Sequence, residues 1–385
     1  MIGMGLRELA GRLVIQDLFV YRCIYIAVTT LVILTACLEG KPFFRRLAEK
    51  RTQILWIILV SVFLGVFAAL RPMSSPDTEA YYEAYTELES PAAYVKEAFW
   101  VGKRAYGMEV GFVLVWAVLK SVFHSFRFTL FLIAFVNALL FLFSAMGIAG
   151  LKQEKSHFAR MLALFFSFFA LHYCCIAIRA GTSLGLGLLG VWLLLKRRYL
   201  WAFLTLYGAM LFHTMAFLLL MFFALTLIRR DKEDFPVKIL IAFSVVCAVV
   251  MVVNLGPAIM RPTVELIRQI LDKLGVMGLR GYLIVEPGDR PGKRIWLTAL
   301  SSIAVLFSVY KNAGIDRNMI IMILLGLFIT AFFYPIRAIN RASDYCYLFL
   351  LPIIAACRFE KLSPFGKAFM GYAIFPVLFV LQLTL

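Results

Sequence analysis

The sequence has few charged residues. Asp, Glu, Lys and Arg together make up 16% of its 385 residues, whereas 63% are hydrophobic and 15% are aromatic. With a mean hydropathy of +0.89, the chain carries more apolar surface than a soluble domain of this length can bury. Lipid must cover the remainder, which excludes a soluble globular protein and indicates a polytopic membrane protein.

Acidic residues are scarcer than basic ones, 22 against 39, so the formal net charge is +17. A nucleic-acid-binding protein gathers its basic residues on one polar face. Here Lys and Arg fall between apolar runs, which is the distribution that the positive-inside rule produces. We therefore expect membrane lipids and an anionic, lipid-linked molecule as partners, and no nucleic acid.

The chain also lacks a recognisable set of metal ligands. Its seven cysteines lie in or at the ends of apolar runs, which is typical of small buried side chains rather than of disulfides or a zinc site. The acidic residues Asp77, Glu79, Glu83 and Glu109 have no spacing diagnostic of a divalent cation. No strand precedes GLGLLG after Arg179, so this run favours close helix packing over a nucleotide site. We expect neither a metal nor a cofactor.

About a dozen apolar runs are long enough to be transmembrane helices, since about 20 residues cross the bilayer core and fewer suffice where it thins. They lie near residues 22–38, 54–70, 128–150, 158–177, 180–195, 199–212, 214–228, 237–255, 295–310, 319–335, 345–357 and 368–384. The sequence therefore predicts an all-α bundle of about 11–12 spans, organised as a single transmembrane domain over residues 1–385.

The charges between the runs predict which side each connection faces. Short basic turns, such as those at 152–155 and 196–198, are predicted to be cytoplasmic, and the acidic loop after Leu70 is predicted to face outward. Between that loop and the turn at 152–155 the chain must cross the membrane an odd number of times, and 128–150 supplies one crossing. Segment 107–126 is then an interfacial helix on the outer side, within a non-spanning region over 71–127.

The dense polar clusters all fall on this predicted outer side. Asp77, Tyr81 and Tyr85 recur four residues apart, so in a helix they share one face and form a polar wall. A charged residue at a helix centre costs about 3 kcal/mol on insertion scales, so charge kept near the membrane usually has a function. The further candidates are Glu109, Arg179, His213, Arg337, Arg341 and Tyr345.

The order and predicted sidedness of these residues resemble the EpsG/Wzy-type bacterial polysaccharide polymerases over about residues 70–350. The shared motifs are Arg71-x5-Asp77-x3-Tyr81-x3-Tyr85, Glu109 shortly before Gly-Phe, Arg179 before small residues, the membrane residue His213, and Arg341-x3-Tyr345. Two positions depart from the family pattern. Val110 stands where the family often has Pro, and the doubled Tyr81–Tyr82 leaves open which phenol faces the site.

The resemblance implies a glycosyltransferase of the bacterial inner membrane, a polymerase of O-antigen or exopolysaccharide. Such an enzyme transfers a growing glycan from undecaprenyl diphosphate to the next lipid-linked repeat unit on the periplasmic face. Its expected partners are the undecaprenyl-diphosphate-linked oligosaccharide and a chain-length regulator protein. The resemblance also implies a GT-C-like architecture, in which an acidic residue follows an early span and interfacial helices come next. Asp77 and segment 107–126 occupy those places.

This chemistry assigns roles to the candidates. The acceptor hydroxyl must lose a proton as it attacks the anomeric carbon, so the catalytic candidates are Asp77 first, Glu109 second and His213 third. The leaving diphosphate needs forked cationic donors, for which the candidates are Arg71, Arg179, Arg337 and Arg341. The phenols of Tyr81, Tyr85 and Tyr345 are expected to line the sugar site. The outer loop 256–294 is rich in Pro and Gly and predicts a mobile flap, with Arg280 and Tyr282 gripping the glycan or gating its entry.

Each assignment has a structural alternative. Asp77 could cap a helix, the tyrosines could belong to the aromatic belt, the arginines could snorkel to headgroups, and His213 could bridge two helices. Among related functions, an O-antigen ligase or a polyprenyl-phosphate-sugar glycosyltransferase stays open. A flippase or exporter of lipid-linked glycan should show internal repeats, and the sequence shows none.

Overall fold

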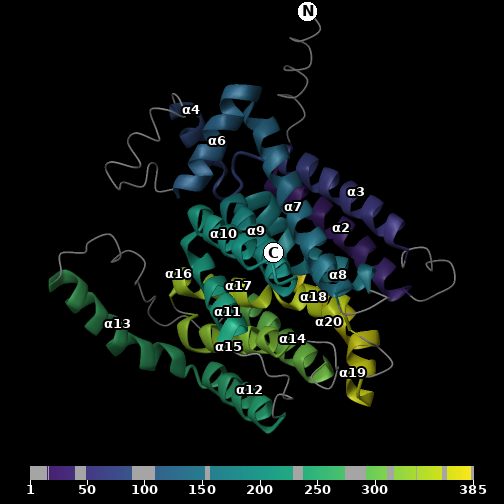
Figure 1. The fold of residues 1–385 in the computed structure, drawn as a ribbon, viewed down its shortest axis with the longest axis vertical. Coiled ribbons are helices and arrows are strands. Elements are labelled where there is room, and N and C mark those ends of the chain that lie inside the picture. The colour runs from purple at the N-terminus through teal and green to yellow at the C-terminus, as the bar shows by residue number, and fades with distance from the viewer. Residues whose placement is uncertain are drawn as a thin grey trace, which may run out of the picture. The chain divides into compact units, whose positions relative to one another are not determined.

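The computed structural model describes residues 15, 17–39, 49–88, 109–151, 157–228, 237–273, 292–309, 316–334, 336–357 and 362–382. Every regular element in these ranges is a helix (Figure 1). The predicted all-α class is therefore confirmed. The chain divides into two compact units, one formed by Met1–Leu151 with Lys155–Phe217 and the other by Lys152–Glu154 with Leu218–Leu385. The expectation of one transmembrane domain stays a prediction.

Unit 1 holds the N-terminal helices. They are α2 (Leu18–Cys37), α3 (Lys50–Ala69), α4 (Thr78–Glu87), α6 (Val110–Phe123), α7 (Phe126–Gly150), α8 (Phe158–Phe165), the π-helix η3 (Phe166–Ile176), α9 (Ile178–Leu195), α10 (Tyr199–Phe212) and the 3₁₀ turn η4 (Thr214–Ala216). Helix α7 packs along α3 and α9, and α10 packs along α9. Their large apolar side chains form the buried core of this unit.

The helices of unit 2 come from the stretch of chain that begins at Leu218. It contains α11 (Phe217–Ile228), α12 (Val237–Val252), α13 (Leu255–Lys273), α14 (Lys293–Val309), α15 (Arg317–Phe333), α16 (Arg337–Asn340), α17 (Ala342–Tyr347), α18 (Leu350–Ala355), α19 (Pro364–Ala368), the π-helix η7 (Phe369–Ala373) and α20 (Ile374–Gln382). Helix α15 contacts α12, α13, α14 and α17, so it is the central helix of this unit.

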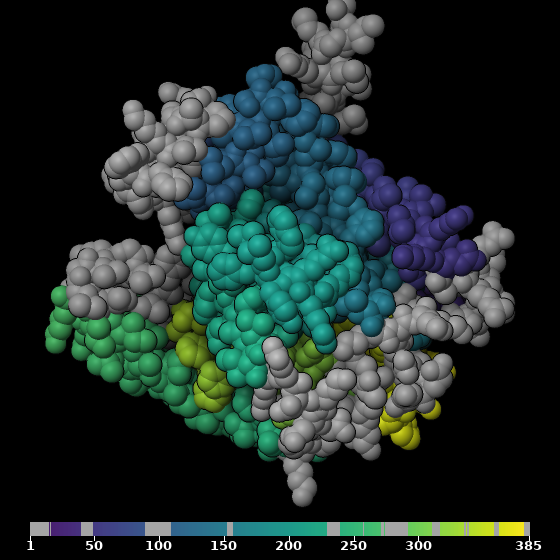
Figure 2. Space-filling model, in the orientation of Figure 1, coloured from purple at the N-terminus to yellow at the C-terminus, as the bar shows by residue number. Residues whose placement is uncertain are grey.

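Five described helices are long and apolar enough to cross a membrane: α2, α3, α7, the continuous α8–η3 pair, and α9. Shorter apolar helices occupy most of the other predicted spans, among them Tyr199–Phe212 and Arg317–Phe333. On α10, Leu200 and Trp201 are more than half exposed. Figure 2 shows this part of the chain, in teal, on the surface that faces the viewer. The chain is therefore a multi-pass membrane protein, and the number of spans stays a prediction.

Small residues of α9 allow close helix packing, as the sequence predicts. A Cβ atom at Gly181 would clash with the carbonyl oxygen of Tyr173, and one at Gly190 would lie 2.6 Å from Leu206 on α10. The amide of Asn137 on α7 donates to the carbonyl of Ile178 at 3.0 Å, at the start of α9. The close approach of Gly181 to Tyr173 and the Asn137–Ile178 hydrogen bond hold the break between η3 and α9, and Gly190 lets α9 pack closely on α10.

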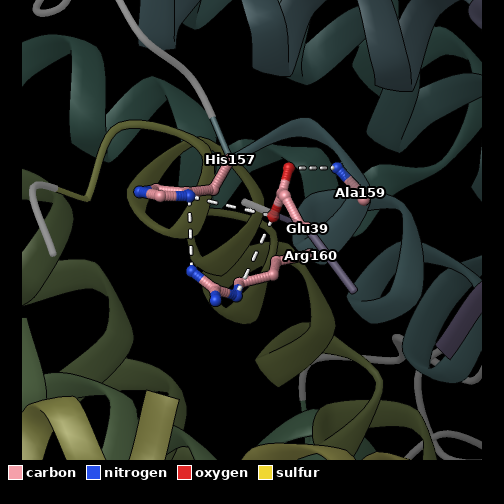
Figure 3. Close-up of polar contacts among 4 residues, drawn as sticks. All are labelled: Glu39, His157, Ala159 and Arg160. Atoms are coloured by element: carbon pink, nitrogen blue, oxygen red, sulfur yellow. Dashed lines mark hydrogen bonds and ion pairs between the residues drawn. The ribbon is translucent and has the colours of Figure 1, made fainter. Parts of the chain in front are cut away.

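At the opposite end of unit 1, the side chain of Glu39 joins α2 to α8 (Figure 3). Its Oε1 accepts a hydrogen bond from the backbone N–H of Ala159 at 2.9 Å, in the first turn of α8. Its Oε2 lies 3.8 Å from His157 Nδ1 and 3.8 Å from Arg160 Nε. A carboxylate from a distant helix therefore caps α8, where the first backbone N–H groups lack partners within the helix.

The segment predicted as an outer loop over 256–294 begins with a helix instead. Helix α13 covers 19 residues, Leu255–Lys273, and contains Pro262. Its apolar and polar residues alternate with the period of a helix, so the segment has no continuous apolar run that would mark it as a span. Arg280 and Tyr282, with the predicted flap, lie outside the described residues.

Candidate functional site

The candidate site of unit 1 begins where α3 ends. Arg71 follows Leu70, the C-cap residue of α3, and is fully buried. Its Nη1 donates to the carbonyl oxygens of Cys175 at 2.5 Å and Ile176 at 3.1 Å, the last residues of η3. The final carbonyls of a helix lack partners within the helix and carry a partial negative charge. Arg71 therefore connects the end of α3 to the break before α9.

Asp77 lies in the turn between Arg71 and α4. Its backbone is left-handed, with φ 62° and ψ −9°, a conformation that Asp and Asn tolerate better than most residues. Although Asp77 precedes the first residue of α4, its side chain makes no capping hydrogen bond to that helix. The side chain is exposed. The capping alternative therefore finds no support, and the carboxylate is open to solvent.

Tyr81 lies on the buried face of α4 among basic groups. The guanidinium carbon of Arg71 lies 5.5 Å from the centre of its ring, and the hydroxyl is within hydrogen-bonding reach of the Arg179 guanidinium. Burial raises the pKa of the Tyr81 hydroxyl, against the lowering effect of Arg179. The phenol is therefore neutral at physiological pH. Because Tyr81 is buried and Tyr82 is exposed, Tyr81 is the phenol that faces the site.

The predicted polar wall is only partly formed. Tyr85 shares the buried face of α4 with Tyr81, and both rings pack against Trp116 of α6. Tyr85 also packs edge-on against Phe126 of α7, whereas Tyr81 lies beside Arg71. Asp77 lies before the helix and is exposed. Tyr85 therefore belongs to an aromatic cluster that holds α4 on α6, because the tertiary contact with α6 decides which face of α4 is buried.

Glu109 and Arg179 form an ion pair. Oε2 of Glu109, immediately before α6, lies 2.8 Å from Nη1 of Arg179, in the first turn of α9. The exposed fractions of the two side chains are 11% and 24%. The charge of Asp77 also acts on Arg179 and on Tyr81, so the three groups are near one another. The segment before α6 and the start of α9 thus meet through their charges.

His213 lies at the same end of unit 1, where α10 ends. Its backbone carbonyl accepts from Ser183 Oγ at 3.5 Å, and Ser183 lies one helical turn after Arg179 on α9. A Cβ atom at Gly111 would lie 2.8 Å from Leu211 Cβ, so the start of α6 touches the end of α10. The side chain of His213 is half-buried.

Two basic residues that the sequence did not single out support this end of unit 1. Arg127 Nη1 donates to the carbonyl oxygens of Ala69 at 3.1 Å and Arg71 at 2.5 Å. Lys120 Nζ donates to the carbonyl of Leu88 at 2.6 Å, at the end of α4. A charge that interrupts an apolar run was the available signal for both residues. What it could not reveal is that their partners are backbone carbonyls.

The remaining candidates belong to unit 2 or lie outside the described residues. Arg341 is exposed and directly precedes α17, and Tyr345 is buried within α17. Arg337 begins α16. Among the described residues, no group of three or more His, Cys, Asp or Glu side chains is arranged to hold a metal ion.

The fold and the site define a class: a multi-pass helical membrane protein in which Arg71, Asp77, Tyr81, Glu109 and Arg179, from three separate segments, meet at one end of one unit. The chain belongs to the EpsG family, which matches residues 54–385. This membership suggests a polysaccharide polymerase with glycosyltransferase-like activity. No curated protein and no solved structure matches the chain, so the GT-C-like arrangement stays a prediction.

Proposed function

We propose that the protein polymerises lipid-linked oligosaccharide repeat units on the periplasmic face of the bacterial inner membrane. The donor is a glycan on undecaprenyl diphosphate and the acceptor is a new lipid-linked repeat unit. One observation carries this proposal: an exposed carboxylate, Asp77, lies near a phenol and an arginine at the helix ends of unit 1. EpsG family membership supports the reaction class.

In the proposed reaction, an acceptor hydroxyl attacks the anomeric carbon of the donor glycan. A new glycosidic C–O bond forms, the C–O bond to the lipid diphosphate breaks, and the hydroxyl proton passes to a carboxylate. Asp77 is the preferred base because its side chain makes no capping bond and faces solvent. The diphosphate leaves with the bonding electrons, and cationic donors stabilise its growing negative charge.

The arginines of unit 1 differ in their availability to a diphosphate. Arg71 is fully enclosed, and its Nη1 already donates to two carbonyls. Arg179 is partly exposed and paired with a carboxylate that a phosphate can replace. Arg179 is therefore the diphosphate ligand that we propose in unit 1, with Glu109 as the group that orients it.

The test is incubation of the purified full-length protein with an undecaprenyl-diphosphate-linked repeat unit, with product length read on a gel. A ladder of repeats supports a polymerase. A single transfer to another lipid acceptor indicates a ligase instead, and addition of one sugar from a polyprenyl-phosphate donor indicates a monosaccharide transferase. Unchanged substrate that appears on the other leaflet of a vesicle would indicate a flippase.

A further inference from the structure

A tight turn of two residues, which we call the elbow, joins α12 to α13 in unit 2. Helix α12 ends at Val252, and Asn254 turns the chain with a left-handed φ of 59° before α13 starts. A Cβ atom at Gly256 would lie 2.7 Å from the carbonyl oxygen of Ala331, and the Tyr334 hydroxyl donates to Asn254 Oδ1. The elbow is therefore held against the end of α15, and Figure 1 shows α13 extending from it.

One edge of α13 is packed and another edge is bare. Met260 and Val264 are buried on the side that contacts α15. Leu255, Ile259, Leu266 and Ile270 form a second apolar stripe at helical spacing, and they are 40%, 44%, 58% and 47% exposed. The valines of α12, for example Val249 at 49%, are exposed to a similar extent. The bare stripe of α13 is thus as exposed as the apolar surface of α12, which lipid covers in a membrane protein.

The polar edge of the same helix carries an open recess. Arg261, Pro262, Val264, Glu265 and Arg268 line a space of about 370 Å³. Arg268 Nη1 lies 3.8 Å from Glu265 Oε2, while Arg268 Nε is buried without a hydrogen-bond partner among the described residues. Arg261 and Arg268 are seven residues apart, so they share one side of the helix. Two guanidinium groups beside one carboxylate leave a net positive charge.

We propose that α13 lies in the membrane interface and binds an anionic phospholipid. The stripe of Leu255, Ile259, Leu266 and Ile270 contacts acyl chains, and Arg261 and Arg268 hold the headgroup phosphate. Arg261 and Arg268 each lie two residues from a residue of the stripe, so they occupy the opposite face of the helix. In a helix that lies in the interface, the apolar face contacts acyl chains and the basic face contacts anionic headgroups. Planar guanidinium groups suit phosphate oxygens. This binding site is independent of the transfer reaction.

The basic recess is tested by lipid retention of the full-length protein in detergent micelles, measured by native mass spectrometry with phosphatidylglycerol or phosphatidylcholine. Arg261→Gln and Arg268→Gln should each weaken phosphatidylglycerol binding about fivefold, since each basic side chain near an anionic surface contributes about 1 kcal/mol. Lys293→Gln, which removes an exposed charge at the start of α14, is the matched control and should bind as the unaltered protein does.

Unchanged phosphatidylglycerol binding in both arginine variants would overturn the headgroup assignment. Equal retention of phosphatidylcholine would do so too, because the site would then lack selectivity for net negative charge. Tighter binding of undecaprenyl diphosphate than of phosphatidylglycerol, lost in both variants, would assign the recess to the sugar donor and refute the proposal.

The apolar stripe is tested separately with a benzophenone amino acid placed at Leu266 or at Gln269 of the protein in lipid nanodiscs. Both positions are exposed, but Gln269 lies off the stripe, towards the polar edge. We expect lipid adducts at position 266 and few at position 269. Equal labelling, or labelling at 269 alone, would show that α13 does not lie on the membrane.

Discussion

Asp77→Asn separates a proton-accepting role from a structural one. Asp77 has a φ of 62°, and Asn adopts this left-handed conformation as readily as Asp. Since the exposed side chain makes no capping bond, the substitution should change the free energy of unfolding by no more than about 0.5 kcal/mol. Removal of a general base lowers a rate about 100- to 10,000-fold, or about 3 to 5 kcal/mol in activation free energy. The chemical effect therefore exceeds the structural one by severalfold.

Two further variants at this position serve as controls. Asp77→Ala places a methyl group in a left-handed backbone at a cost of about 1–2 kcal/mol, whereas Asp77→Gly removes that strain. If Asp77 is the base, the Asn, Ala and Gly variants should all fail to extend the lipid-linked glycan. The assay is the initial rate of polymer extension, measured beside the thermal unfolding midpoint. Normal extension by Asp77→Asn, or activity in Gly but not in Ala, would refute the catalytic role.

Three other substitutions test the site and its support. Arg179→Lys should lose most of the polymerising activity, because an ammonium group cannot reproduce a forked contact. If Arg179 and Glu109 act as a unit, adding Glu109→Gln should lower the extension rate little further, and a double-variant cycle on extension rates measures this. Gly181→Ala should lower the free energy of unfolding by about 1–3 kcal/mol or prevent folding, because the new Cβ would clash with a backbone carbonyl. Thermal unfolding in detergent measures this loss of stability. In the same assay, Glu39→Ala should lower the free energy of unfolding by about 1–2 kcal/mol. Glu39→Gln should lower it less, because the amide oxygen still accepts a hydrogen bond from Ala159. Equal losses would show that the charge of Glu39 matters more than its capping hydrogen bond.

The sequence was sufficient for the helical class and for the helix between the second and third long spans. Charge parity predicted an interfacial helix over 107–126, and the structure has the 14-residue helix α6 (Val110–Phe123) there. Its position on the membrane stays a prediction, because α10, which occupies a predicted span, is also 14 residues long. Arg71, Asp77 and Tyr81, which the sequence grouped as candidates, also lie near one another in the fold, and the side of the membrane that they face stays a prediction. These features depend on local composition and order along the chain, which a sequence displays directly.

Features that depend on tertiary contacts could not be predicted. Tyr81 and Tyr85 both pack with Trp116, yet Tyr81 also lies beside the Arg71 guanidinium and Tyr85 packs on Phe126. Only the positions of the neighbouring helices decide this difference. Arg127 binds carbonyls at the end of α3, which no residue pattern displays. Helix α13 was missed for another reason. Its apolar residues follow a helical period, but charged residues separate them into runs too short for a span, and Pro262 favoured a loop.

The charges of unit 1 indicate how the proposed transfer divides between residues. Arg71 and Arg127 donate to backbone carbonyls at helix ends, where the partial negative charge of the peptide groups stabilises them. Glu109 neutralises Arg179. Among the site residues Arg71, Asp77, Tyr81, Glu109 and Arg179, Asp77 is exposed and has no ion-pair partner within the described part of the chain, so its carboxylate suits activation of an acceptor hydroxyl better than the binding of a diphosphate. For the proposed reaction, the donor diphosphate must then open the Glu109–Arg179 pair. Opening the pair makes Glu109 a competitor of the diphosphate, so Glu109→Gln should tighten donor binding even where it slows extension.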